Sequence, residues 1–124
     1  MNKILLDTDV IIENFRGNGP ILEKIKDLKD EKAFIYISPI SIAEVYAGLR
    51  SGEEKIVGEF FNSVPCLPIN ESIGVNAGEY LRLYSRSHGL EVADALIAAL
   101  SFHSKARLFT LNKKHYPMKD IRLV

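Results

Sequence analysis

The sequence predicts an α/β domain in which a short parallel sheet is covered by helices on both faces, as a three-layer sandwich. Short apolar runs typical of buried strands alternate along the chain with longer segments of helical periodicity. Residues 92–103 are apolar almost all round a helical wheel, so this helix should lie between other layers. The 124 residues contain no repeat or linker, and we expect one domain over 1–124.

The composition is that of a globular protein, with 47% hydrophobic and 26% charged residues. Cys66 is the only cysteine, so an internal disulfide is excluded. The N-terminus reaches Asp7 too soon for a signal peptide, and the apolar helix is too short to cross a bilayer. We therefore expect a cytoplasmic protein with no membrane partner. Residues 105–124 hold six Lys or Arg against one Asp, although the net charge is zero, and this favours polyanion binding there.

The first predicted strand is an apolar run over residues 3–7 that ends in Asp7. Either Thr8 or Asp9 is expected to cap the helix over 10–16, and Asp9 is interpreted as a capping residue. Asp7 then lies at a strand-to-helix junction, which is where open α/β sheets bind their ligands.

Residues 21–32 predict an amphipathic covering helix, and residues 34–37 a second buried strand. Ser38 and Pro39 begin a helix over 40–50 that carries two apolar faces. Glu44 is the only ionisable group on the narrow polar stripe between those faces. This placement favours an acid that lines a cleft, with a solvent-facing Glu as the alternative.

The remaining elements continue the alternation. We expect a short helix over 53–63, an extended connection over 64–69 that two prolines restrict, and a long helix from Asn70 to near Gly89. Arg82 and Arg86 lie one turn apart on its outer side and could contact phosphates. After the central helix come a strand over 107–110, a polar loop over 111–117 and a last strand over 120–124.

Asp94 interrupts the apolar central helix in its first turn. A carboxylate that enters a core loses several kcal/mol of hydration unless hydrogen-bond donors or a cation replace it. Ala98 and Ser101 follow on the same stripe, and their small side chains are expected to leave room for a group that approaches Asp94. The alternative is that Asp94 only caps its own helix.

Asp7, Glu44 and Asp94 share one property: each breaks an otherwise apolar element. In a parallel sheet all three can face the same carboxyl-end edge. Carboxylates that crowd together repel unless one takes up a proton or they share a divalent cation. Oxygen-only ligands select Mg²⁺ or Mn²⁺, and such an ion can lower the pKa of a bound water and hold a phosphate oxygen. The pattern therefore predicts phosphodiester hydrolysis.

Four segments also resemble the successive signatures of PIN-domain ribonucleases, most closely the VapC-type toxins of toxin–antitoxin pairs. They are residues 5–10 (LLDTDV), 41–49 (SIAEVYAGL), 92–98 (VADALIA) and 109–116 (FTLNKKHY). The resemblance implies a PIN-like fold and a Mg²⁺- or Mn²⁺-dependent endoribonuclease that cleaves RNA. It also implies inhibition by a VapB-type antitoxin and a homodimer.

The resemblance assigns roles to individual residues. Asp7, Glu44 and Asp94 become the catalytic acids and metal ligands, with Asp7 and Asp94 in direct contact with the ion. Asn112 occupies the fourth acidic position of many PIN domains and adds no charge for a second metal. Thr8, Ser41, Thr110 and Asn112 are expected to assist the acids, and Arg82, Arg86, Lys113, Lys114 and His115 to contact RNA. A water would attack phosphorus in line, without the 2′-OH, and leave 5′-phosphate and 3′-OH ends.

Other classes fit less of the chain. Residues 7–10 also resemble the first motif of haloacid-dehalogenase phosphatases, but no later pair of acids or partner lysine follows. A receiver domain needs an acceptor Asp at the end of a middle strand, and residues 34–38 contain none. The non-enzyme alternative is a degenerate PIN module that binds RNA or an antitoxin without cleavage, and Asn112 keeps it open.

Overall fold

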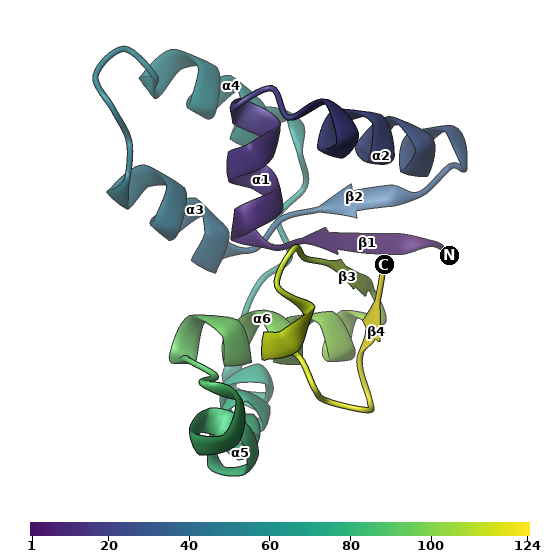
Figure 1. Cartoon of the computed structure of the whole chain (residues 1–124), viewed down its shortest axis with the longest axis vertical. Coiled ribbons are helices and arrows are strands. Elements are labelled where there is room, and N and C mark those ends of the chain that lie inside the picture. Colours follow the sequence, from purple (N-terminus) through teal and green to yellow (C-terminus); the bar gives the residue numbers. More distant parts are fainter.

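The computed structural model describes residues 1–124 and confirms the three-layer α/β arrangement (Figure 1). Its sheet is entirely parallel, in the order β2-β1-β3-β4. The strands are β1 (Lys3–Leu6), β2 (Phe34–Tyr36), β3 (Arg107–Phe109) and β4 (Arg122–Leu123). The helices are α1 (Thr8–Phe15), α2 (Gly19–Asp30), α3 (Pro39–Ala47), α4 (Glu54–Ser63), α5 (Glu71–His88) and α6 (Val92–Ser104), with a 3₁₀ turn η1 (Lys113–His115). None of the helices has the length and hydropathy of a membrane span.

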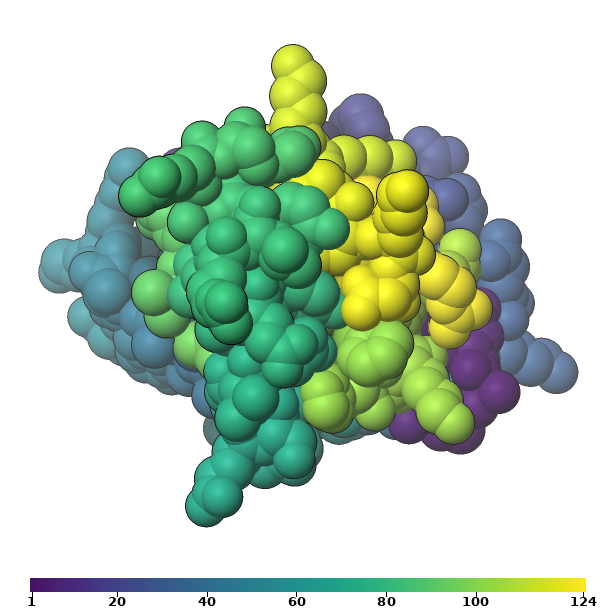
Figure 2. Space-filling view, turned by 90° about the horizontal axis from the view of Figure 1, so that it is seen from below, coloured from purple at the N-terminus to yellow at the C-terminus, as the bar shows by residue number.

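Strand β1 lies at the centre and separates two hydrophobic clusters. Leu5 points into a cluster with side chains of α5, α6 and the C-terminal segment, whereas Ile4 and Leu6 point into a cluster with α1 to α4. This alternation is expected because successive side chains of a strand face opposite sides of the sheet. Figure 1 shows the result, with α1 to α4 on one side of the sheet and α5 and α6 on the other. Figure 2 shows α5 and the C-terminal segment side by side on the outer surface of that second layer.

The carboxyl ends of the strands meet at one edge of the sheet. Leu6 pairs with Phe109, and the next amide, that of Asp7, donates to the Phe109 carbonyl at 2.9 Å. Asp7 and Thr110 therefore follow their strands at the same level. The β1–α1, β2–α3 and β3–η1 connections all leave from this edge, and this arrangement positions the candidate site.

Two elements differ from their predictions. Residues 34–37 were expected to form a buried strand, but β2 is an edge strand and Phe34 is 51% exposed. Its far end is covered by the extended connection, where Ile37 N donates to Pro65 O at 3.0 Å. Of the two apolar faces predicted for α3, the one with Ile42, Val45 and Leu49 packs against the core, whereas Ala43 and Ala47 on the other face are exposed. An apolar run or stripe does not by itself say whether a neighbour covers it.

Helix α6 is the central helix, as predicted. Six of its residues between Ala95 and Ser101 are buried, all except Leu96. The expected room beside Ala98 and Ser101 is absent. Both side chains are fully buried, and Ser101 Oγ donates to the Ala106 carbonyl at 2.8 Å. The small residues on this stripe serve close packing of α6 in the core and do not open a path to Asp94.

Candidate active site

Asp7 is the most buried acid of the site, with 7% of its surface exposed. It caps α1, since its Oδ1 accepts from Thr8 N at 2.8 Å, so the prediction that Thr8 or Asp9 is the cap is wrong. Its Oδ2 accepts from Thr110 Oγ1 at 2.8 Å and from the Tyr116 hydroxyl at 2.9 Å. Three donors from three segments therefore fix the Asp7 carboxylate at the end of β1.

The negative charge of Asp7 has no cationic partner. Burial raises the pKa of Asp7 above its ordinary value, and the charge of Asp94 raises it further. Hydrogen bonds from Thr110, Tyr116 and Thr8 act in the opposite direction without cancelling the effect on the pKa. Neither of the two ion pairs in the molecule involves Asp7. Asp7 is thus a desolvated carboxylate that a cation would stabilise.

Asp94 lies beside Asp7 and is joined to it through Tyr116. The Tyr116 hydroxyl, which donates to Asp7, also contacts Asp94 Oδ1 at 3.4 Å. Burial and the charges of both acids hold the pKa of Tyr116 above its ordinary value, so the phenol keeps its proton. Asp94 Oδ2 accepts from Glu91 N at 3.3 Å. Asp94 is therefore the N3 residue of a capping box with Glu91, the N-cap of α6, and it contacts Tyr116 at the same time, so the two interpretations of this residue are compatible.

Glu44 reaches the site through hydroxyl groups. Thr8 Oγ1 donates to Glu44 Oε1 at 2.6 Å and lies 2.9 Å from Ser41 Oγ. Ser38 Oγ donates to Ser41 Oγ at 3.3 Å, so a chain of hydroxyls runs from Ser38 through Ser41 and Thr8 to Glu44. Ser38 and Ser41 are fully buried, whereas Glu44 itself is exposed. Thr8 therefore contacts Glu44 directly and Ser41 contacts Thr8, and the assisting role expected of both stays a prediction.

Asp9 and Asn112 are the remaining polar residues near the acids. Asp9 Oδ2 accepts from Leu111 N at 3.1 Å, while its Oδ1 is buried without a hydrogen-bond partner. Burial and the charge of Asp7 raise the pKa of Asp9 to about 6. Asn112 Nδ2 lies 2.9 Å from Nδ1 of His115, and that nitrogen is 3.7 Å from Asp94 Oδ2. His115 is therefore a half-buried group at the rim.

A comparison with known protein families identifies this chain, since residues 4–121 match the PIN domain. The chain belongs to the PIN domain family. Ribonuclease VapC10 of Mycobacterium tuberculosis is 34% identical over 116 residues, which cover 93% of this chain and 86% of that protein. Ribonuclease VapC19 of the same species is 31% identical, with 92% of each chain covered.

Solved structures agree on the fold. The structure of VapBC2 from Rickettsia felis, bound to a DNA fragment from its promoter, matches with a TM-score of 0.80 and 21% identity. The match covers 98% of this chain and 97% of that one. Membership of the PIN domain family sets aside the phosphatase and receiver-domain alternatives.

The basic residues of this PIN domain lie in two different places. Lys113 and Lys114 border an open depression of about 860 Å³ that Thr110 and Asn112 also line. None of the acids lines it, but the Thr110 hydroxyl donates to Asp7. Lys24 of α2 lines the same depression and was not predicted. Arg82 and Arg86 are exposed on α5, and neither forms a hydrogen bond or ion pair with a residue of the site.

Sequence reasoning missed two members of the site. Tyr116 was part of a matched motif but received no role, and Asp9 was interpreted only as a cap. A signal for Tyr116 exists, since it is an aromatic residue in a polar loop, directly before Pro117. Asp9 lies two residues after Asp7 and therefore cannot be far from it.

The acids suit a hard divalent cation by their chemistry. Their ligand atoms are all oxygens, their charges lack a Lys or Arg partner, and Asp9 Oδ1 is buried and unpaired. The side chains are not yet gathered as one ligand set, because no three His, Cys, Asp or Glu side chains lie close enough to hold one ion. The structure brings Asp7 and Asp94 together, and links Glu44 to them only through Thr8.

Proposed function

We propose that this PIN domain is a Mg²⁺- or Mn²⁺-dependent endoribonuclease and the toxin of a toxin–antitoxin pair. The observation that carries the proposal is Asp7, a buried carboxylate without a basic partner that Tyr116 joins to Asp94 at the carboxyl-end edge of the sheet. Uncompensated carboxylates at such an edge favour a bound cation. Relatives named ribonucleases favour RNA as the substrate.

In this proposal Asp7 and Asp94 would hold the ion, and Glu44, which Thr8 links to them, would complete the site directly or through a water. The bound ion would polarise a phosphate oxygen and lower the pKa of a bound water. Thr110 and Tyr116 orient the Asp7 carboxylate, and Thr8 orients Glu44 through its hydroxyl. A water would add to phosphorus in line, without the 2′-OH, as the bond between phosphorus and the 3′ oxygen breaks. The leaving 3′ oxygen would take up a proton from solvent, so the products should carry 5′-phosphate and 3′-OH ends.

The residues around the acids would bind the RNA backbone. Lys113 and Lys114 border the depression beside Thr110, and Lys24 extends this basic wall from α2. Asn112 contacts His115, which lies 3.7 Å from Asp94, and both would contact the phosphates near the cleaved bond. Binding by these groups is electrostatic and should weaken with salt.

The partners in this proposal are a VapB-type antitoxin and a second copy of the chain. VapBC2 of Rickettsia felis was solved as a complex, which favours an antitoxin for this chain as well. Co-expression with the product of a neighbouring small gene should yield a stable complex without ribonuclease activity. Light scattering of the purified chain should report a dimer, and a monomer would contradict that part.

The decisive experiment compares acid variants on an RNA substrate. Asp7→Asn and Asp94→Asn should each reduce cleavage by at least about a hundredfold, because each removes one charge from the ion site. Asp120→Asn is the matched control, since Asp120 accepts from Tyr80 outside the site and should retain activity. Circular dichroism of each variant tests the fold. Full activity in either site variant, or 2′,3′-cyclic phosphate ends, would contradict the proposal.

A degenerate PIN module remains the second candidate, and Asn112 favours it because the fourth acidic position carries no charge. Such a module would bind RNA with or without Mg²⁺ and Mn²⁺ and would not cleave it. Purification under denaturing conditions and refolding would first remove any bound antitoxin. RNA binding without metal-dependent cleavage after that step would favour this candidate over the nuclease.

A further inference from the structure

We propose that the Tyr116 hydroxyl is a positioning group that takes the place of a cation between Asp7 and Asp94 in the metal-free protein. This inference rests on the ion site of the proposed function. It concerns a residue that the three-acid pattern leaves without a role. The hydroxyl lies 2.9 Å from Asp7 Oδ2 and 3.4 Å from Asp94 Oδ1, so a single O–H group faces both carboxylates.

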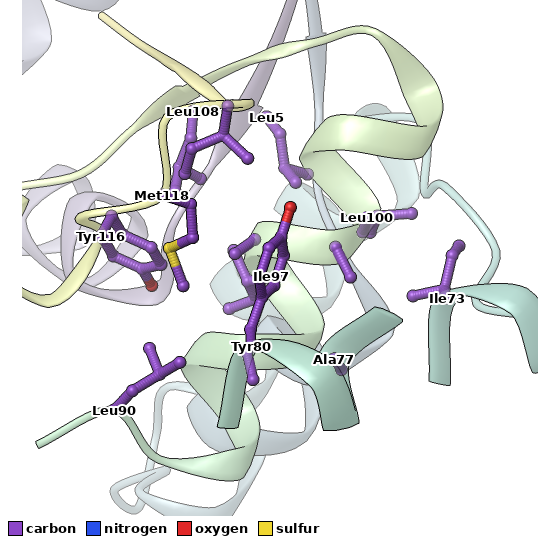
Figure 3. Close-up of a cluster of buried hydrophobic side chains, with 14 of the residues drawn as sticks. Leu5, Ile73, Ala77, Tyr80, Leu90, Ile97, Leu100, Leu108, Tyr116 and Met118 are labelled. Atoms are coloured by element: carbon purple, nitrogen blue, oxygen red, sulfur yellow. The ribbon is translucent and has the colours of Figure 1, made fainter. Parts of the chain in front are cut away.

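The core fixes the position of that hydroxyl. Tyr116 is 4% exposed, and its ring belongs to the hydrophobic cluster that also contains Leu90, Ile97 and Met118. Figure 3 shows the Tyr116 ring beside Met118, on the C-terminal segment that follows η1. A ring packed in this way has little rotational freedom, because protein cores are close-packed. The hydroxyl is therefore placed by the fold, at the point where it faces both carboxylates.

The charges around Tyr116 explain why a donor is needed there. Asp7 and Asp94 repel each other, and neither has a Lys or Arg partner. His115, the one group near Asp94 that can become cationic, is 3.7 Å away, too far for a hydrogen bond. A hydrogen bond to a carboxylate is worth most when no cation shares the charge. The contribution of Tyr116 should therefore be large without metal and smaller once an ion is bound.

The chain offers a matched control. Tyr80 also donates from a buried ring to a carboxylate, with its hydroxyl 3.0 Å from both oxygens of Asp120. This pair joins α5 to the C-terminal segment and contains no residue of the site. Tyr80→Phe and Tyr116→Phe each remove one phenolic oxygen, so they differ mainly in the carboxylates that lose a donor.

The first arm is a melting experiment with and without saturating Mn²⁺. In EDTA, Tyr116→Phe should lower the Tm by roughly 5 °C. Saturating Mn²⁺ should bring its Tm to within about 1 °C of the wild type. Tyr80→Phe should lower the Tm by the same amount in EDTA and in Mn²⁺. By linkage, Tyr116→Phe should bind Mn²⁺ roughly fivefold more tightly in calorimetry. Equal responses of the two variants to Mn²⁺, or weaker Mn²⁺ binding by Tyr116→Phe, would overturn the proposal.

The second arm needs no metal and tests the bridge itself. In EDTA, the Tm loss from Tyr116→Phe should fall to about half when Asp94→Asn is also present, because the second carboxylate charge is gone. An unchanged loss would show that the hydroxyl serves Asp7 alone and would overturn the bridge. A wild type that binds no Mn²⁺ and cleaves no RNA would contradict the proposed function, while this cycle would still decide whether Tyr116 joins the acids.

Discussion

Asp9 is a half-buried acid of the site with an unusual environment. One of its carboxylate oxygens is buried without a partner, and the neighbouring charge of Asp7 adds to the effect of burial. Together they raise its pKa to about 6 from 3.8. The folded protein then binds a proton more readily than the unfolded chain between these values, so stability falls as the pH rises through this interval. Above it, the ionised Asp9 lowers the free energy of unfolding.

Asp9→Asn should therefore stabilise the metal-free protein near neutral pH. We expect a gain of about 1 kcal/mol, because solvent screening and an unpaired amide reduce the effect that the pKa alone suggests. Below the unfolded pKa of an aspartate the gain should vanish, since Asp9 is then protonated in both states. Urea unfolding in EDTA at both pH values measures the difference. Asp30→Asn, at an exposed position, is the control and should change little at either pH.

The acids and their helpers differ in how far the sequence could predict them. Asp7, Glu44 and Asp94 break apolar patterns that are visible in a short stretch of chain. Tyr116 and Asp9 do not, because their roles depend on contacts across about a hundred residues, such as Leu111 N to Asp9. Chain spacing contains no signal for the sharing of one hydroxyl by two carboxylates. The roles of the three acids stay predictions until variants are measured.

At the scale of elements, the positions of helices and strands were predicted well from their periodicity, and their burial was predicted less well. Asn70 caps α5, and Gly89 ends it with a left-handed φ of 63°, both at the predicted positions. The burial of β2 and the second apolar face of α3 were wrong, because the apolar pattern of an edge strand is the same as that of a central one. Which layer covers a given face is decided by topology, and the parallel order β2-β1-β3-β4 leaves β2 at the edge.

Helix α6 gives a direct test of how its small residues act. Ala98 is completely buried in the cluster around Leu5 and Leu108, so Ala98→Leu would overfill a packed core. We expect a loss of about 2 kcal/mol in the free energy of unfolding. Ala47→Leu, at an exposed position of α3, is the matched control and should change stability by less than about 0.5 kcal/mol. Denaturant unfolding measures both, and a tolerated Ala98→Leu would restore the idea of an open space beside Asp94.

Over the whole molecule, basic residues are concentrated in the C-terminal segment, while the rest of the chain is acidic. This division suits a site that binds both a cation and a polyanion. The last twenty residues hold six Lys or Arg and one Asp, and Lys113 and Lys114 line a depression together with Thr110, whose hydroxyl donates to Asp7. A polyphosphate chain held by these lysines would pass the acids. Repulsion between RNA and the carboxylates would be relieved only by a bound ion, so metal and RNA should bind cooperatively.

The salt dependence of RNA binding tests this division. With cleavage prevented by Asp94→Asn, Lys113→Ala together with Lys114→Ala should reduce the slope of log affinity against log salt by about 1.4, because two phosphate contacts are lost on a single strand. Arg82→Ala with Arg86→Ala removes the same charge from the exposed face of α5 and should change the slope less, since that pair has no contact with the site. Fluorescence anisotropy over a salt series gives both slopes. Equal decreases in slope from the two pairs would show that RNA also contacts α5. A larger decrease from the arginine pair would show that RNA binds away from the acids.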